Sequence, residues 1–233
     1  MMFLLLLAVC TDCHKTEAAH FAQSAMGHAL SRDTAKWTFG AGKVGKTWMY
    51  EKDGRWYESK MSYYKSLNGL DLTIGHQIPK GLDEVFGRLT SPTEAKQCFS
   101  CHTITCETCH GEDPHTGKFQ KMNAEEHNDF CGKCHRTWAS IAANGPRGIQ
   151  NIRFQPYRLA LSKCPDLRCS TCHEPHSGVV NDPKCATCHQ SCKAGETKNC
   201  VSCHMPRLEL PGAHAKFTDH KIRVVRPNER YPD

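Results

Sequence analysis

The sequence predicts a mostly irregular and helical fold that contains a small β-hairpin and little conventional hydrophobic core. The chain has 233 residues, and Leu, Ile, Val and Phe together account for only 39 of them, or about 17%, which is too few for a large core. Sixteen cysteines are far more than an ordinary globular domain carries. A chain of this composition needs covalent staples or bound groups to supply buried surface that its own side chains lack.

The cysteines indicate which group that is. Fourteen of the sixteen form seven Cys-x-x-Cys pairs, and a histidine directly follows every pair. Cys-x-x-Cys-His is the attachment signature of c-type haem, whose iron takes the histidine as proximal ligand. Zinc sites do not require this histidine, and a disulfide framework does not favour the two-residue spacing. The sequence therefore predicts seven covalent haems, at Cys10-Cys13-His14, Cys98-Cys101-His102, Cys106-Cys109-His110, Cys131-Cys134-His135, Cys169-Cys172-His173, Cys185-Cys188-His189 and Cys200-Cys203-His204.

Covalent haem also predicts export, because c-type haem is attached outside the cytoplasmic membrane; we expect a periplasmic or extracellular, cell-surface protein. Residues 1–9 are apolar but carry no basic residue, and they are too short to span a bilayer. We interpret them as the remnant of a signal segment that is cleaved or poorly ordered. A membrane contact would then arise only through a missing or remnant N-terminal signal.

Beyond that segment, residues 10–233 are expected to form a single heptahaem domain. Its successive parts are the first haem with a β-hairpin insert, haems two to four, a bridge, and haems five to seven with the tail, over residues 10–97, 98–135, 136–168 and 169–233. Within the first part, Thr16–Leu30 is Ala-rich and predicts a helix. Residues 37–66 predict short β structure, in which Asp53-Gly54 between aromatic segments forms the hairpin turn. Residues 67–96 are expected to be irregular with helical turns.

A glycine-rich stretch, Gly40–Thr47, matches the phosphate-binding pattern G-x-x-x-x-G-K-[ST] at every position. That motif works only between a buried strand and a helix. Here the preceding residues 31–38 are polar and charged, and the following residues lead into the expected hairpin. We therefore interpret the glycines as a tight turn and not as a nucleotide site.

Eight histidines lie outside the motifs, and each of seven irons can accept one further ligand. We predict that these histidines supply the sixth ligands, which closes both faces of an iron and suits electron transfer better than substrate chemistry. Met26 is an additional candidate, and local spacing does not show which residue serves which haem. The eight candidates are His20, His28, His76, His115, His127, His176, His214 and His220.

Two cysteines, Cys164 and Cys192, belong to no motif. In an oxidising compartment they are candidates for a disulfide that closes a loop of about 28 residues. The alternative is a pair of unrelated buried thiols.

The formal charge of +6 initially suggests anionic partners. Seven haems with two propionates each would add about −7 when the irons are ferric, which brings the total close to neutral. The basic residues are also not clustered in blocks. We therefore expect lysines and arginines to pair with propionates, and no nucleic-acid partner.

Further local patterns lie in and around the motifs. They are Phe21-x-x-Ser24-Ala25-Met26-Gly27, Gly40-Ala41-Gly42, Met61-Ser62-Tyr63-Tyr64, Cys106-x-x-Cys109-His110-Gly111 with His115, Cys169-Ser170-Thr171-Cys172-His173-Glu174-Pro175-His176, and Cys203-His204-Met205-Pro206. Together these patterns resemble the multihaem cytochromes c of environmental bacteria, which are often fused to tetratricopeptide repeats and are related to small tetrahaem carriers. The resemblance implies that His115, His176, His214 and His220 are distal ligands, that Cys164 and Cys192 form an extra pair, and that the glycine-rich stretch begins the hairpin. The chain departs from the pattern because it lacks the repeats and carries His76.

The expected function is electron transfer along closely spaced haems, with other redox proteins or cytochromes as partners. Terminal haems at Cys10 and Cys200 would also allow copies of the chain to join into an oligomer or filament. The alternative is an enzyme that reduces or oxidises a small nitrogen or sulfur species at one five-coordinate haem. In that case His76, Lys43 and Lys46 are candidates to surround the open iron.

Overall fold

The computed structural model describes residues 10–111, 114–144, 149–164, 166–181, 185–189 and 199–226. They divide into two compact units. Unit 1 contains the residues up to Pro114 together with Pro175–Gly178 and Pro211–Ala215, and unit 2 contains His115–Glu174, Val179–Leu210 and the residues from Lys216 onward. Within the described ranges, no helix is long and apolar enough to cross a membrane.

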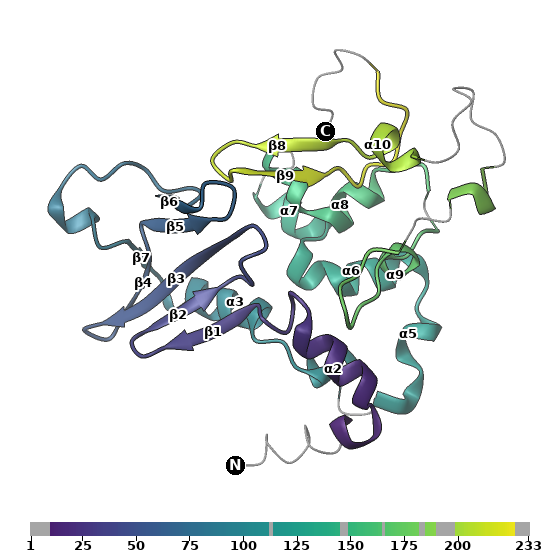
Figure 1. The fold of residues 1–233 in the computed structure, drawn as a ribbon, viewed down its shortest axis with the longest axis horizontal. Coiled ribbons are helices and arrows are strands. Elements are labelled where there is room, and N and C mark those ends of the chain that lie inside the picture. Colours follow the sequence, from purple (N-terminus) through teal and green to yellow (C-terminus); the bar gives the residue numbers. More distant parts are fainter. Residues whose placement is uncertain are drawn as a thin grey trace. The chain divides into compact units, whose positions relative to one another are not determined.

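A seven-stranded antiparallel sheet organises unit 1 (Figure 1). Its main path runs β1-β2-β3-β4-β7, while β5 pairs with both β3 and β6. The strands are β1 (Leu30–Asp33), β2 (Lys36–Phe39), β3 (Gly45–Lys52), β4 (Arg55–Glu58), β5 (Met61–Tyr64), β6 (Gly69–Leu72) and β7 (Arg88–Thr90).

The turn expected at Asp53-Gly54 is present and joins β3 to β4. Both residues have positive φ, 53° and 70°, as a two-residue hairpin turn requires. The sheet nevertheless extends well beyond a single hairpin. β1 is Leu-Ser-Arg-Asp, with three exposed residues of four, so its pairing with β2 comes from the backbone and leaves little hydrophobic alternation to detect.

The glycine-rich stretch Gly40–Thr47 does not form a phosphate-binding loop. Gly40 and Gly42 have φ of 102° and 78° in the β2–β3 connection, a conformation that favours glycine. β3 begins at Gly45, so Lys46 and Thr47 lie in a strand where a nucleotide site would need a helix. The Thr47 hydroxyl is 2.6 Å from that of Ser62 on β5.

The predicted helix over Thr16–Leu30 is shorter than expected, because α2 spans Lys15–Gln23. Ser24 follows the helix, donates its hydroxyl to the Phe21 carbonyl oxygen and accepts a hydrogen bond from the Gly27 backbone N–H. A side chain at Gly27 would lie 2.2 Å from the Phe21 oxygen. The serine and glycine therefore redirect the chain, which outweighs the helical composition of the segment.

The core of unit 1 lies between the sheet and α3 (Pro92–His102). Alternation along the strands places Phe39 and Met49 on the face that packs against Ala95 and Phe99 of α3. Ser91 caps this helix in a reciprocal capping box with Glu94. The sheet thus holds the helix that carries the second Cys-x-x-Cys-His motif. Unit 1 also contains the 3₁₀ turn η1 (Leu82–Glu84) and α4 (Cys106–His110).

Unit 2 is mainly helical, with a core that includes Ile141, Ile152, Tyr157 and Leu210. Its longest helix, α6, begins at a capping box between Asn123 and Glu126. The helical elements are η2 (Pro114–Thr116), α5 (Lys118–Lys121), α6 (Ala124–His135), α7 (Trp138–Asn144), η3 (Ile149–Arg153), α8 (Gln155–Ala160), α9 (Cys169–Cys172), η4 (Cys185–Thr187) and α10 (Cys200–His204); β8 (Arg207–Leu210) pairs with β9 (Ala215–Thr218).

Candidate haem sites

Each of the seven motifs lies on a helical turn. Residues 10–13 are helical, and the other six pairs lie on α3, α4, α6, α9, η4 and α10. Residues three apart on a helix share a face, so both sulfur atoms of a pair can reach one porphyrin edge. The following histidine lies at the end of that turn. This local geometry is what the attachment signature requires.

Hydrogen bonds orient two of the motif histidines for iron binding. His102 Nδ1 is 3.0 Å from the Ala29 carbonyl oxygen, and His204 Nδ1 is 2.9 Å from that of Arg223. A carbonyl oxygen only accepts, so Nδ1 donates the proton and Nε2 keeps its lone pair for a metal. His220, outside the motifs, has the same arrangement, with Nδ1 3.0 Å from the Thr218 carbonyl oxygen.

Two motif histidines face candidate distal histidines across a gap that fits an iron atom. The ring centroids of His110 and His176 are 6.0 Å apart with planes 5° from parallel, and those of His173 and His220 are 6.1 Å apart at 20°. Two metal–nitrogen bonds of about 2 Å each, plus about 1 Å from each nitrogen to its ring centre, give about 6 Å. The residues present therefore fit a bis-histidine haem at both places.

Burial favours the ligating form of three of these rings, His110, His173 and His220. Burial lowers the pKa of His110, with smaller contributions from His176 and His14. Burial likewise lowers the pKa of His173 and of His220. A neutral imidazole is the metal ligand, so depressed pKa values favour iron binding at neutral pH.

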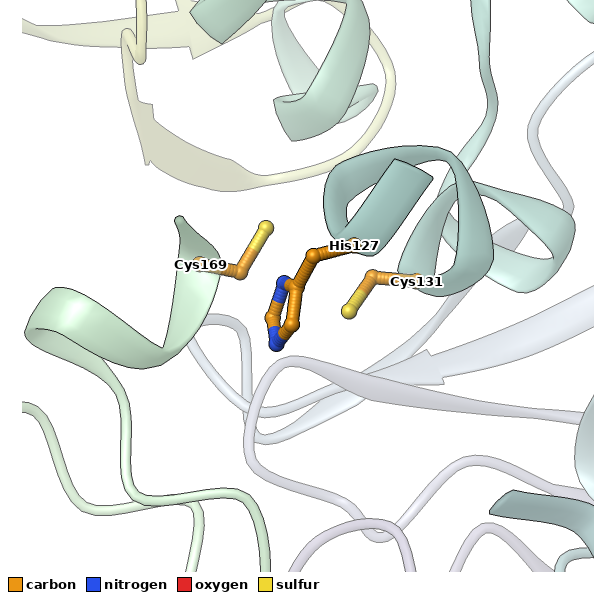
Figure 2. Close-up of side chains that lie close together, drawn as sticks. All are labelled: His127, Cys131 and Cys169. Atoms are coloured by element: carbon orange, nitrogen blue, oxygen red, sulfur yellow. The ribbon is translucent and has the colours of Figure 1, made fainter. Parts of the chain in front are cut away.

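Cysteines of different motifs come close together in unit 2. One atom each from His127, Cys131 and Cys169 lies within 4.8 Å of the others, and Figure 2 shows the imidazole between the two cysteines. Three such ligands resemble part of a zinc site. Each cysteine, however, belongs to a separate Cys-x-x-Cys-His motif, which is the donor set of covalent haem. The sequence did not predict this proximity, because Cys131 and Cys169 are 38 positions apart.

Asn128 of α6 holds the two motifs together. Its side-chain oxygen accepts from the Cys169 backbone N–H at 2.9 Å, and its Nδ2 donates to the Leu167 carbonyl oxygen at 2.8 Å. The Cys169 thiol also lies 3.2 Å from the same Asn128 oxygen. One amide therefore fixes the start of α9 against α6.

Two of the eight distal candidates are engaged by carboxylates. His76 is almost fully buried, and its Nε2 is 3.0 Å from Glu58 Oε2. His214 Nε2 is 2.6 Å from Asp71 Oδ2, in the turn between β8 and β9. In this structure neither ring presents its Nε2 to a motif histidine, although the resemblance implied a distal role for His214.

The other candidates have varied surroundings. His127 is buried, with Nε2 3.2 Å from the Ser170 hydroxyl. His20, His28 and His115 are exposed, as are Lys43 and Lys46. Among the sequence predictions, the structure thus brings His176 and His220 to motif histidines. The iron-ligand roles of the other candidates stay predictions.

The proposed disulfide falls partly beyond the part of the chain that the structure describes. Cys164 is half-buried. Cys192 lies outside the described residues, so the pairing stays a prediction.

Part of the chain matches a known protein family. Residues 103–190 match the family model of cytochrome c3. The match contains four motifs and supports a multihaem cytochrome c family, and with it electron transfer by covalently bound c-type haem iron. Proteins of the cytochrome c3 family are typically exported to the periplasm. No curated protein and no solved structure matches the chain.

Proposed function

We propose that the chain is an exported heptahaem cytochrome that carries electrons along a row of closely spaced haems. Each bound haem supplies a one-electron iron centre. The chain's own residues attach it, ligate it and fix its distance from the next centre. The observation that carries the proposal is the adjacency of attachment points from different motifs.

This adjacency recurs along the chain. Besides the contact of Cys131 with Cys169, the Cys185 thiol is hydrogen-bonded to Cys200 and interacts electrostatically with Cys172. In unit 1, Cys106 interacts electrostatically with Cys10. Each interaction joins two motifs, so we expect porphyrins attached at these sulfur atoms to lie close together. Such spacing favours electron transfer over isolated chemistry at single sites.

We further propose that the partners are other redox proteins or cytochromes, including copies of the same chain. Cys13 of the first motif and Cys203 of the last are exposed, which supports terminal haems that a partner can reach. End-to-end contact between copies would extend the row into a filament outside the cell. Analytical ultracentrifugation over a range of concentrations tests this part, and a monomer at every concentration would exclude it.

Soret circular dichroism tests the close haem spacing, because neighbouring porphyrins couple and split the band. We expect a two-signed Soret signal in the native protein and a weaker one after Asn128→Leu, which releases α9 from α6. Gln120→Leu alters an exposed amide on α5 and should leave the signal unchanged. A single-signed Soret band in a protein that carries all seven haems would refute the proposal.

A specific observation favours a second function, an enzyme acting on a small nitrogen or sulfur species. The carboxylates on His76 and His214 leave six of the eight candidate histidines for seven irons. One iron would then be ligated by a residue such as Met26 or keep an open face. Addition of nitrite, hydroxylamine or sulfite distinguishes these cases, since only an open iron changes its absorption spectrum on binding.

A further inference from the structure

A buried ionic cluster lies in unit 2 outside every haem motif. Arg158 of α8 and Asp219, which follows β9, both have no solvent exposure. They form a two-point ion pair, with Arg158 Nε 2.8 Å from Oδ1 and Nη2 3.0 Å from Oδ2 of the aspartate. A buried ion pair adds little net stability, because desolvation offsets most of the attraction. The two-point contact does, however, fix the orientation of the two side chains relative to each other.

Asp219 also binds the residues that follow it. Its Oδ1 accepts from the Lys221 backbone N–H at 3.0 Å, and its Oδ2 accepts from Arg223 Nη1 at 2.6 Å. The Asp219 backbone N–H donates to the Pro206 carbonyl oxygen at 2.9 Å. Both side-chain and backbone hydrogen bonds of Asp219 therefore fix the turn from residue 219 to residue 223.

This turn supports ligands at two different haem sites. His220 stands next to Asp219 and faces His173 at 6.1 Å. At the end of the turn, the Arg223 carbonyl oxygen accepts the Nδ1 proton of His204, the motif histidine of α10. The same cluster thus contacts the segment that carries His220, the candidate distal ligand of the Cys169 site, and the segment that orients His204, the candidate proximal ligand of the Cys200 site.

We propose that Arg158, Asp219 and Arg223 form an ionic node that positions the iron ligands His220 and His204 and sets the electrostatic field at both irons. The inference rests on the haem sites proposed above. The three residues are positioning residues, because they act through the histidines. Loss of a cation near an iron favours the ferric state, so removal of the Arg223 charge lowers the reduction potentials of these two haems.

The test uses the full haem-loaded chain and the variants Arg223→Gln and Arg223→Lys. Arg223→Gln should shift the low-temperature electron paramagnetic resonance signals and lower the potentials of two haems, while the other five stay as in the native protein. Arg223→Lys keeps the charge and should restore the potentials. Arg55→Gln removes an exposed arginine of β4, in unit 1 and outside both haem sites, and serves as the matched control, with no expected change.

Two further variants address the ion pair itself. Arg158→Lys retains the charge but loses the two-point geometry, so it should shift resonance signals more than potentials. Asp219→Asn should affect the same two haems; if it fails to fold, Arg223, with 13% of its side chain exposed, still decides the question. Unchanged haems in Arg223→Gln, or equal changes in all seven, would overturn the inference. Haem content measured on the native protein tests the proposed function separately.

Discussion

His176→Ala tests the ligand geometry directly, because it deletes one of two nearly parallel imidazoles. The His110 and His176 centroids are 6.0 Å apart, a separation that fits two metal–nitrogen bonds of about 2 Å plus about 1 Å from each nitrogen to its ring centre. In the proposed bis-histidine site, loss of His176 removes the sixth ligand of the iron at His110, which should become high-spin. With seven haems, as proposed, about 14% of the total haem should change spin state.

Low-temperature electron paramagnetic resonance with spin quantitation measures this fraction. His214→Ala is the matched control, because Asp71 holds the His214 Nε2 at 2.6 Å and no iron should lose a ligand. External imidazole should return the His176→Ala spectrum to low spin by filling the vacated position. An entirely low-spin His176→Ala protein, or a new high-spin signal in His214→Ala, would refute the geometric reasoning.

Three further predictions concern the scaffold of unit 1. Hydrogen bonds from the Ser91 backbone N–H and from Arg88 lower the pKa of Glu94 from 4.5 to about 2. Its carboxylate therefore stabilises the fold above pH 4.5, and this contribution disappears as the pH falls towards 2. Glu94→Gln should cost about 1 kcal/mol at pH 7 and flatten the acid side of the stability profile, as measured by thermal unfolding; an unchanged profile would contradict it. Phe99→Ala removes three edge-to-face aromatic contacts and should cost about 3–5 kcal/mol in denaturant unfolding, with a loss below about 1 kcal/mol refuting the packing. Gly87→Ala places a Cβ 2.3 Å from a carbonyl oxygen of β4 at φ 142° and should cost about 1–3 kcal/mol by the same measurement, whereas a neutral effect would argue against this backbone path.

Local sequence patterns predicted part of the fold. The Asp53-Gly54 turn and the helical Cys-x-x-Cys-His turns depend on adjacent residues, so their patterns are visible in the chain. The capping box Ser91-x-x-Glu94 is also a local signal, and it marks the start of α3. Such elements can be predicted because the interactions that define them span only a few residues.

Long-range pairing could not be predicted in the same way. His110 and His176 are 66 positions apart, and no local pattern distinguishes His176 from His214. The difference appears only when folding places Asp71 beside His214. The extent of the sheet was missed for a similar reason, since β1 is paired through its backbone while its side chains are mostly exposed.

The ionic node illustrates the same limit. Arg158 and Asp219 are separated by 61 residues, and neither belongs to a haem motif. Neither composition nor charge patterning distinguished Arg158 or Asp219 from the other charged residues of the sequence. Their burial and their position beside His220 follow from the packing of α8 against the chain that leaves β9.

The most direct test of the central claim is the intact mass of the protein purified from a host that exports and matures c-type cytochromes. The account predicts a mass that exceeds the polypeptide by seven haem groups and does not change on denaturation, because every haem is held by thioether bonds at its cysteine pair. A mass with fewer haems, or one in which unoccupied Cys-x-x-Cys pairs carry zinc or disulfides, would contradict the account.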